Sequence, residues 1–254
     1  MKISIVTPVY NDPRVSRALD SVFAQRFDGA LESIVIDGGS TQETLTILEQ
    51  YRSRLATFVS EPDRGIYDAM NKGVLRATGD IVGILNADDL YNDDLVLRDV
   101  LKSFEDSTVQ AVYGDLVYID SNSQIVRYWK SGRCRPWKFH LGWMPPHPTF
   151  FVRRSLYERY GLFNLRLPIA ADYEIILRFL LKRRTHVAYI PRVLVQMSTG
   201  GNSNKSIRNI VQANKEVLQA WRVNGLAMGY LAPLLKPTSK LFQHLRRPPR
   251  VMGA

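Results

Sequence analysis

Two adjacent carboxylates, Asp88 and Asp89, follow a short apolar run at residues 81–85. Such a run is typical of a strand that is buried on both faces in a parallel sheet. Ligands of open α/β sheets bind beyond the carboxyl ends of the strands, where these side chains would project. With the carboxamide of Asn86, the carboxylates could ligate a hard divalent cation, Mg²⁺ or Mn²⁺, and leave positions for phosphate oxygens. The alternative interpretation is a solvated acidic loop that caps a helix.

The residues ahead of this strand predict a loop followed by a helix. Pro62 and Gly65 give residues 61–65 the composition of a turn whose backbone can approach a ligand closely. The helix would bury an apolar stripe and end at a glycine. These positions are Ile66, Met70, Val74, Ala77 and Gly79.

Strands and helices also alternate in the preceding part of the chain. We expect strands at residues 2–9, 31–37 and 57–60, with Ser40 and Glu43 forming a capping box at the start of the second helix. This order predicts a mostly parallel α/β sheet with right-handed crossovers and a nucleotide-type site along its carboxyl edge.

The second half of the chain predicts antiparallel additions. Residues 92–104 have a helical pattern, and residues 110–128 alternate as strands around a turn at 121–123. Residues 129–150 combine Trp, His, Lys, Arg and Pro with little periodicity, which favours a functional loop. Later helices are expected at 155–160, 171–183 and 207–221, and strands at 187–191 and 193–197.

Length and composition are those of an ordinary globular protein. The 254 residues can bury the core of one large α/β domain, alone or with a small appendage. A single cysteine, Cys134, excludes an internal disulfide framework. We expect no secretory signal and no membrane span. These expectations favour a cytoplasmic protein, either free or peripheral on the inner face of the plasma membrane.

The net charge of +10 is concentrated near the C-terminus. Residues 201–254 hold nine Lys or Arg and one Glu, a net charge of +8. Residues 226–254 could lie on an anionic membrane, pack on their own domain, or contact a second copy of the chain. Nucleic acid is not an expected partner, because the cations form no recognised motif and the acidic cluster would repel phosphate.

Four segments, in this order, resemble the motif series of the family 2 glycosyltransferases. They are SIVTPVYN at 4–11, VIDGGST at 35–41, DRGIYDAMNKG at 63–73 and LNADD at 85–89. The resemblance is strong over about the first 115 residues and continues through residues 147–178. Four ordered motifs are far more specific than one.

The resemblance implies a GT-A (Rossmann-like) fold and an inverting, metal-dependent enzyme. It would move a sugar from a nucleoside-diphosphate sugar, first of all a UDP-sugar, to a glycan or lipid-linked acceptor in cell-surface polysaccharide biosynthesis. Residues 1–115 would form the donor half, 116–200 the acceptor half of the same domain, and 201–254 a helix and basic tail. The rival functions are a non-catalytic nucleotide or nucleic-acid binding module and a nucleotidyltransferase.

The resemblance also assigns roles around the acidic motif. Asp88 would ligate the metal, and Asn86, where the family motif has an acid, would bond to ribose or phosphate. Asp89 is either a second metal ligand or a helix cap. The remaining donor-binding residues would be Pro8, Tyr10, Asn11, Asp37, Asp63, Gly65 and Lys72.

The chemistry of three of these residues can be compared with the roles that the resemblance implies, and two of the three also have a second interpretation. Asp37 can accept a hydrogen bond from a base or ribose. Tyr10 can stack on the base or simply pack at the rim, and Lys72 can contact phosphate or remain solvated.

The second half of the resemblance provides the reacting groups. Asp172 would be the general base, although helix capping alone would also justify it. Glu174 is the substitute candidate for the base. His147 and Trp143 would line the active site, with His147 contacting the metal or the acceptor.

Overall fold

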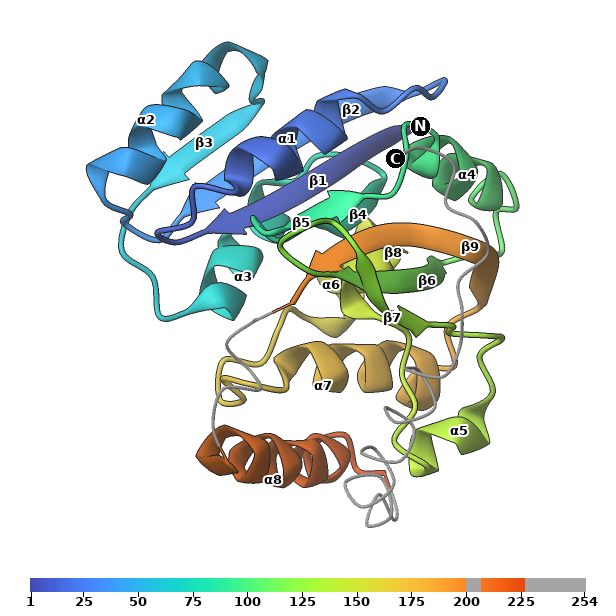
Figure 1. The fold of residues 1–254 in the computed structure, drawn as a ribbon. Helices are drawn as coiled ribbons and strands as arrows, with labels where there is room; N and C mark the ends of the chain where they lie inside the picture. The colour runs from blue at the N-terminus through green and yellow to red at the C-terminus, as the bar shows by residue number, and fades with distance from the viewer. Residues whose placement is uncertain (200–206, 227–254) are drawn as a thin grey trace.

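The computed structural model describes residues 1–199 and 207–226, and in them nine strands form one mixed sheet flanked by helices (Figure 1). The order across the sheet is β3-β2-β1-β4-β8-β6-β9-β5, and β7 pairs with β6. The strands are β1 (Lys2–Val9), β2 (Ala30–Asp37), β3 (Thr57–Ser60), β4 (Ile81–Ile84), β5 (Asp89–Tyr91), β6 (Ala111–Ile119), β7 (Ile125–Trp129), β8 (Phe151–Arg153) and β9 (Val187–Ser198). The expected α/β sheet, mostly parallel with antiparallel additions, is confirmed.

The parallel strands end together at one edge of the sheet. Val9 pairs with Asp37, and Asp37 pairs with Ser60, so the last residues of β1, β2 and β3 lie side by side. β8 is antiparallel to both β4 and β6, which means that β6, and β9 beside it, run in the same direction as β1–β4. Loops that follow these strands therefore emerge at a common rim.

The helices cover both faces of the sheet. They are α1 (Val15–Phe23), α2 (Gln42–Gln50), α3 (Ile66–Arg76), α4 (Val96–Ser103), α5 (Pro136–His140), α6 (Arg154–Tyr160), α7 (Ala171–Leu177), which continues as a π-helical turn over Arg178–Lys182, and α8 (Ile207–Val223). Short 3₁₀ turns occur at Arg52–Arg54 and His147–Thr149. α1 and α4 pack against one apolar cluster, and α3, α6 and α7 against another, with α8 outside α7 (Figure 1).

Helix α3 lies unusually close to β1. A Cβ atom on Gly73 would be 2.2 Å from Cγ1 of Val6, so only glycine fits without displacing that side chain. The expected stripe is confirmed at Met70 and Val74, whereas Ile66 is 46% exposed and Tyr67 is buried instead. The helix ends at Arg76, ahead of the expected stop at Gly79.

Other local expectations were wrong. Ser40 and Glu43 form no capping box: α2 has Thr41 as its N-cap residue, without a side-chain cap, and the Ser40 hydroxyl donates to Asp37. β5 and β8 were not expected, and the two strands expected near the C-terminal half of the sheet form the single strand β9. No helix in the described residues combines the length and apolar composition needed to cross a bilayer. Most of the basic tail, residues 227–254, lies outside the described part of the chain.

Candidate functional site

The acidic motif is built into the sheet rather than into a free loop. Asp89 opens β5 and pairs with Met197 of β9, and its side chain is fully buried. Its Oδ2 accepts a hydrogen bond from Nδ2 of Asn86 at 3.0 Å. Oδ1 of Asp89 and Oδ1 of Asn86 are also buried and accept no hydrogen bond from the described residues. Two such oxygens carry a free-energy cost unless a ligand or cation meets them.

Asp88 lies beside a cation at the start of α1. Nη2 of Arg14, in the residue before that helix, is 3.5 Å from Oδ2 of Asp88 and 2.6 Å from Oδ2 of Asp12. Burial raises the pKa of Asp88, and the Arg14 charge opposes this rise. Burial, together with the Asp88 charge, holds the pKa of Asp89 well above its usual value. Bringing a cation to this pair would therefore favour both ionised carboxylates.

The donor atoms at this position fit a hard divalent cation. They are oxygens of Asp88, Asp89 and Asn86, and Mg²⁺ is commonly held by one or two carboxylates plus substrate phosphates. No group of three or more His, Cys, Asp or Glu side chains in the described residues is arranged to hold a metal by itself. The helix-cap interpretation of Asp89 is wrong, since α4 begins at Val96 after Leu95.

The ends of β1 and β2 are tied together by polar contacts. The buried Asp37 carboxylate accepts from the N–H of Ser40 at 3.0 Å and from Oγ of Ser60 at 2.7 Å. Asn11 has a positive φ of 46°, and its side-chain oxygen accepts from the N–H of Thr41 at 2.7 Å. These contacts fix both loops, and Asp37 is largely engaged within the protein.

One aliphatic residue, Pro8, and one aromatic residue, Tyr10, lie at the same rim. Pro8 is buried in β1, whereas Tyr10, just beyond the strand, is 65% exposed. The ring of Tyr10 is thus available at the edge of the site, and its stacking on a base stays a prediction.

The loop before α3 folds back on itself. Oδ1 of Asp63 accepts from the N–H of Gly65 at 2.8 Å, and Gly65 has a φ of 111°, which favours glycine. Nζ of Lys72 lies 2.9 Å from a carboxylate oxygen of Glu61 and donates to the carbonyl of Pro62 at 3.0 Å. Lys72 is therefore held against this loop rather than simply solvated, and a phosphate contact would compete with Glu61.

Asp172 is held by a tyrosine of α3. Its Oδ1 is 3.1 Å from the hydroxyl of Tyr67 on α3 and accepts from the N–H of Tyr173 at 2.7 Å. The Tyr67 hydroxyl is also 3.0 Å from the carbonyl of Ile169. Burial and the Asp172 charge hold the pKa of Tyr67 well above its usual value, so Tyr67 remains a donor. Asp172 does not cap α7, whose N-cap residue is Ala170.

His147 belongs to the same group. Its ring is edge-on to Phe163 at a centroid distance of 5.6 Å, and Phe163 stacks on Tyr67 at 5.7 Å. Burial lowers the pKa of His147, while the Asp172 charge opposes this, so the ring is neutral at pH 7. A neutral imidazole can accept a proton or bond to an acceptor hydroxyl.

Tyr118 connects the two acidic groups, and sequence reasoning missed it. Tyr118 on β6 pairs with Met197 of β9, which pairs in turn with Asp89, so the three side chains share one face of the sheet. Burial raises the pKa of Tyr118, and the charges of Asp89 and Asp172 raise it further, against Arg127. The charges of the acidic motif and of Asp172 thus both act on the Tyr118 hydroxyl. The position of Tyr118 at the end of a predicted strand was the available signal.

Two expected site residues are not brought to this group. Glu174 is 3% exposed, bonds to Nη2 of Arg178 at 2.7 Å, and accepts from Nδ2 of Asn224 of α8 at 2.8 Å. Trp143 donates from Nε1 to the carbonyl of Ser131 at 2.9 Å. Both side chains thus stabilise packing between segments.

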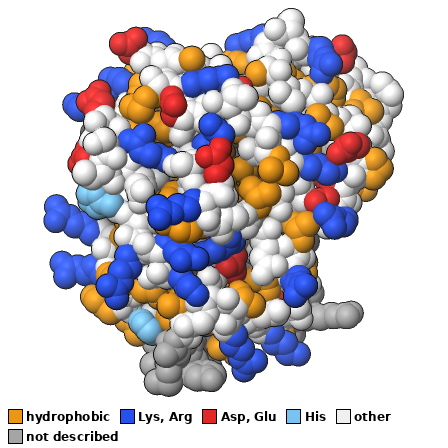
Figure 2. Space-filling model, turned by 180° about the vertical axis from the view of Figure 1, so that it is seen from behind, with side chains coloured by type: hydrophobic (Ala, Val, Ile, Leu, Met, Phe, Trp, Pro, Cys, Tyr) orange, Lys and Arg blue, Asp and Glu red, His pale blue; other side chains and the backbone are white. Residues whose placement is uncertain are grey.

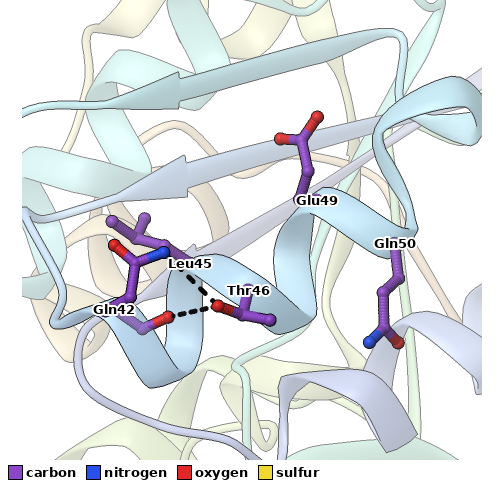
Figure 3. Close-up of a pocket in the computed structure, with 5 residues that line it drawn as sticks. All are labelled: Gln42, Leu45, Thr46, Glu49 and Gln50. Atoms are coloured by element: carbon purple, nitrogen blue, oxygen red, sulfur yellow. Dashed lines mark hydrogen bonds between the residues drawn. The ribbon is translucent and has the colours of Figure 1, made fainter.

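A shallow depression on the outside of α2 is unsuited to this chemistry (Figure 3). It is lined by side chains from that helix alone, and Thr46 bonds to the carbonyl of Gln42 at 2.8 Å within it. The depression has a single carboxylate, Glu49, and none of the rim residues described above lines it.

Solved structures share the fold. Staphylococcus aureus TarS, residues 1–349 in complex with UDP, superposes with a TM-score of 0.62 at 18% identity, covering 87% of this chain and 65% of that chain. A mannosyltransferase from Pyrobaculum calidifontis, in complex with GDP-Man and Mn²⁺, gives a TM-score of 0.64 at 23% identity, covering 93% and 72%. The GT-A-like α/β fold is confirmed.

Curated relatives are more similar in sequence. An uncharacterized glycosyltransferase of Mycobacterium tuberculosis is 36% identical over 183 residues, which cover 69% of this chain and 68% of that protein. A PGL/p-HBAD biosynthesis glycosyltransferase of Mycobacterium bovis is 34% identical over 180 residues, with the same coverage of 69% and 68%. The profile of Glycosyl transferase family 2 matches residues 4–161, and the chain therefore belongs to that family.

Proposed function

We propose that this glycosyltransferase moves a sugar from a nucleoside-diphosphate sugar to a glycan or lipid-linked acceptor, with inversion at the anomeric carbon. A UDP-sugar is the first candidate for the donor. The observation that carries the proposal is that Asp172, bonded by the Tyr67 hydroxyl, and Asp89 of the acidic motif both act electrostatically on the buried hydroxyl of Tyr118. A relative named as a PGL/p-HBAD biosynthesis glycosyltransferase supports a role in biosynthesis of cell-surface glycans.

Asp172 is the general base of this proposal. Its Oδ1 is fixed by Tyr67 and by the N–H of Tyr173, and no hydrogen bond from the described residues occupies Oδ2. Oδ2 can therefore take the proton from an acceptor hydroxyl as that oxygen attacks the anomeric carbon and the nucleoside diphosphate leaves. Attack from the face opposite the leaving group gives inversion.

The donor is positioned by the rim of the sheet. Tyr10 supplies an exposed aromatic face, and Asn86, Asp88 and Asp89 supply oxygens at the diphosphate. A bound Mg²⁺ or Mn²⁺ would neutralise the departing diphosphate. Arg14 contributes a fixed positive charge at the same place.

A panel of nucleotide sugars, with and without Mn²⁺, tests the proposal by release of nucleoside diphosphate. We expect Asp88→Asn to lose metal-stimulated release and to weaken Mn²⁺ binding measured calorimetrically with UDP present. Asp28→Asn, at an exposed aspartate far from the rim along β2, is the matched control. Products that retain the nucleotide, detected by mass spectrometry, would instead indicate a nucleotidyltransferase.

A further inference from the structure

A second surface of the molecule combines exposed apolar side chains with cations. Trp137 on α5 is 56% exposed, and Leu141, which follows the helix, is 41% exposed. Lys130, Arg133 and Arg135 precede them and are also exposed. These five residues are called the α5 surface below.

The charge around the α5 surface is one-sided. From residue 121 to residue 157 the sequence contains no Asp or Glu. In the described part of the chain, no carboxylate forms an ion pair with Lys130, Arg133 or Arg135. Burial and the nearby charge of Arg135 lower the pKa of Lys138, as expected where positive charge is uncompensated. On the side that carries α5, at lower left in Figure 2, Lys, Arg and apolar side chains gather.

The α5 surface rests on a fixed support. Phe139, on the inner side of α5, is 1% exposed, and the ring of His140 lies 4.8 Å from that of Trp221 of α8. Nζ of Lys138 donates to the carbonyl of Arg133 at 2.8 Å, and the hydroxyl of Tyr113 donates to that of Gly132 at 2.7 Å. Trp137 and Leu141 therefore project from an anchored segment, because its inner side is already used for packing.

The described chain also ends near this surface. Leu226 packs against the apolar cluster that contains Phe139 and Trp221. Residues 227–254, which include five further Lys or Arg, begin at that point. The N–H of Leu226 donates to the carbonyl of Trp221 at 3.0 Å, and the ring of Trp221 lies beside that of His140 on α5, so the basic tail starts close to the α5 surface.

We propose that the α5 surface docks on an anionic lipid bilayer. Trp137 and Leu141 would enter the boundary between headgroups and acyl chains, while Lys130, Arg133 and Arg135 contact lipid phosphates. Amphipathic surfaces bind membranes by this combination of apolar burial and attraction to anionic lipid. An exposed aliphatic side chain beside the Trp favours a bilayer over a nucleic acid, whose phosphates need cations alone. The proposal goes beyond sugar transfer and does not depend on it.

Co-sedimentation of the full chain with vesicles tests this docking, without donor or metal. We expect binding to vesicles of equal parts phosphatidylcholine and phosphatidylglycerol, decreasing with salt, and little binding to phosphatidylcholine alone. Lys130→Gln/Arg133→Gln/Arg135→Gln should lower the partition coefficient about a hundredfold, since each cation contributes separately. Trp137→Ala should lower it about tenfold, through lost apolar burial.

Matched variants separate the α5 surface from general charge and apolarity. Arg17→Gln/Arg26→Gln/Lys102→Gln removes the same charge from exposed positions on and near α1 and α4, and Leu75→Ala shortens a side chain that is 70% exposed on α3. Both should bind vesicles like the wild type. Brominated phosphatidylglycerol should quench wild-type tryptophan fluorescence, and Trp137→Phe should bind but lose most of this quenching.

Three outcomes would overturn the proposal. The first is equal binding to neutral and anionic vesicles. The second is unchanged binding in the α5 variants, which would assign any membrane contact to residues 227–254. The third is tighter binding to RNA than to vesicles, lost in the same triple variant, which would make the surface a nucleic-acid site.

Discussion

Asp172 and Glu174 lie two residues apart on α7, and we expect opposite effects when each loses its charge. Loss of the Asp172 charge should lower activity, whereas loss of the Glu174 charge should lower stability. Asp172→Asn removes the proposed base but keeps an oxygen for the bonds from Tyr67 and the Tyr173 N–H. We therefore expect unfolding free energy within about 1 kcal/mol of the wild type. Transfer should decrease by about 10²–10⁴-fold, the usual contribution of a general base, which corresponds to about 3–5 kcal/mol of barrier.

Glu174→Gln should show the reverse pattern. Glu174 is buried with Arg178, whose guanidinium also donates to the carbonyls of Tyr160 and Leu162 at 2.6 and 2.7 Å. Removing one charge of a buried ion pair costs about 3–5 kcal/mol, and the glutamine oxygen that remains places this variant at the lower end. Turnover per folded molecule should be unchanged, because Glu174 faces Asn224 and not the site.

Urea unfolding and nucleoside-diphosphate release, measured on both variants at the same temperature, check this pair of expectations. Donor binding by calorimetry should be retained in Asp172→Asn. Near-wild-type transfer by folded Asp172→Asn would refute the assignment of the base. Loss of turnover in folded Glu174→Gln, without loss of stability, would show that the base is the second acid instead.

Three further variants test the packing of the sheet and the support of the site. Burial alone would raise the pKa of Glu32, but bonds from Lys2, Ser4 and Thr78 lower it to about 2 from its usual 4.5. The folded-state pKa is depressed, so this stabilisation, about 3 kcal/mol, is present above pH 4.5 and lost as the pH falls toward 2. Glu32→Gln should therefore be less stable than the wild type at pH 7, and urea titrations should show the difference shrinking at pH 3; a constant difference would contradict this. Gly73→Ala should cost about 1–3 kcal/mol in thermal unfolding, because its Cβ would displace Val6. Tyr67→Phe should lower kcat with little change in KM, since only the support of Asp172 is lost; an altered KM alone would argue for a donor contact.

Several strands of the parallel part of the sheet were predictable from the sequence. β1 and β3 have the expected bounds, and the run after α3 forms the buried strand β4. The apolar run of β4 is continuous and each of its residues is buried, so local composition and tertiary burial agree there. The acidic end of β4 at the rim of the sheet followed from the same pattern.

Short elements and long-range partners were not predictable in this way. β5 and β8 have three residues each, too few for a periodic signal, and they exist because β9 and β4 pair with them. The role of Tyr67 depends on Asp172, 105 positions along the chain. The expected Ser40 cap failed because a nearby carboxylate, Asp37, offered the hydroxyl a stronger partner.

The interleaving of the strands has a mechanical consequence. β8, from residues 151–153, lies between β4 and β6, while β5, from residues 89–91, forms the far edge beyond β9. The chain thus passes repeatedly between the β1–β4 part of the sheet and the β6–β9 part, and these two parts cannot swing apart about a single connection without breaking strand pairing. Severing the chain after residue 115, inside β6, would leave both fragments with bare strand edges that invite misassembly.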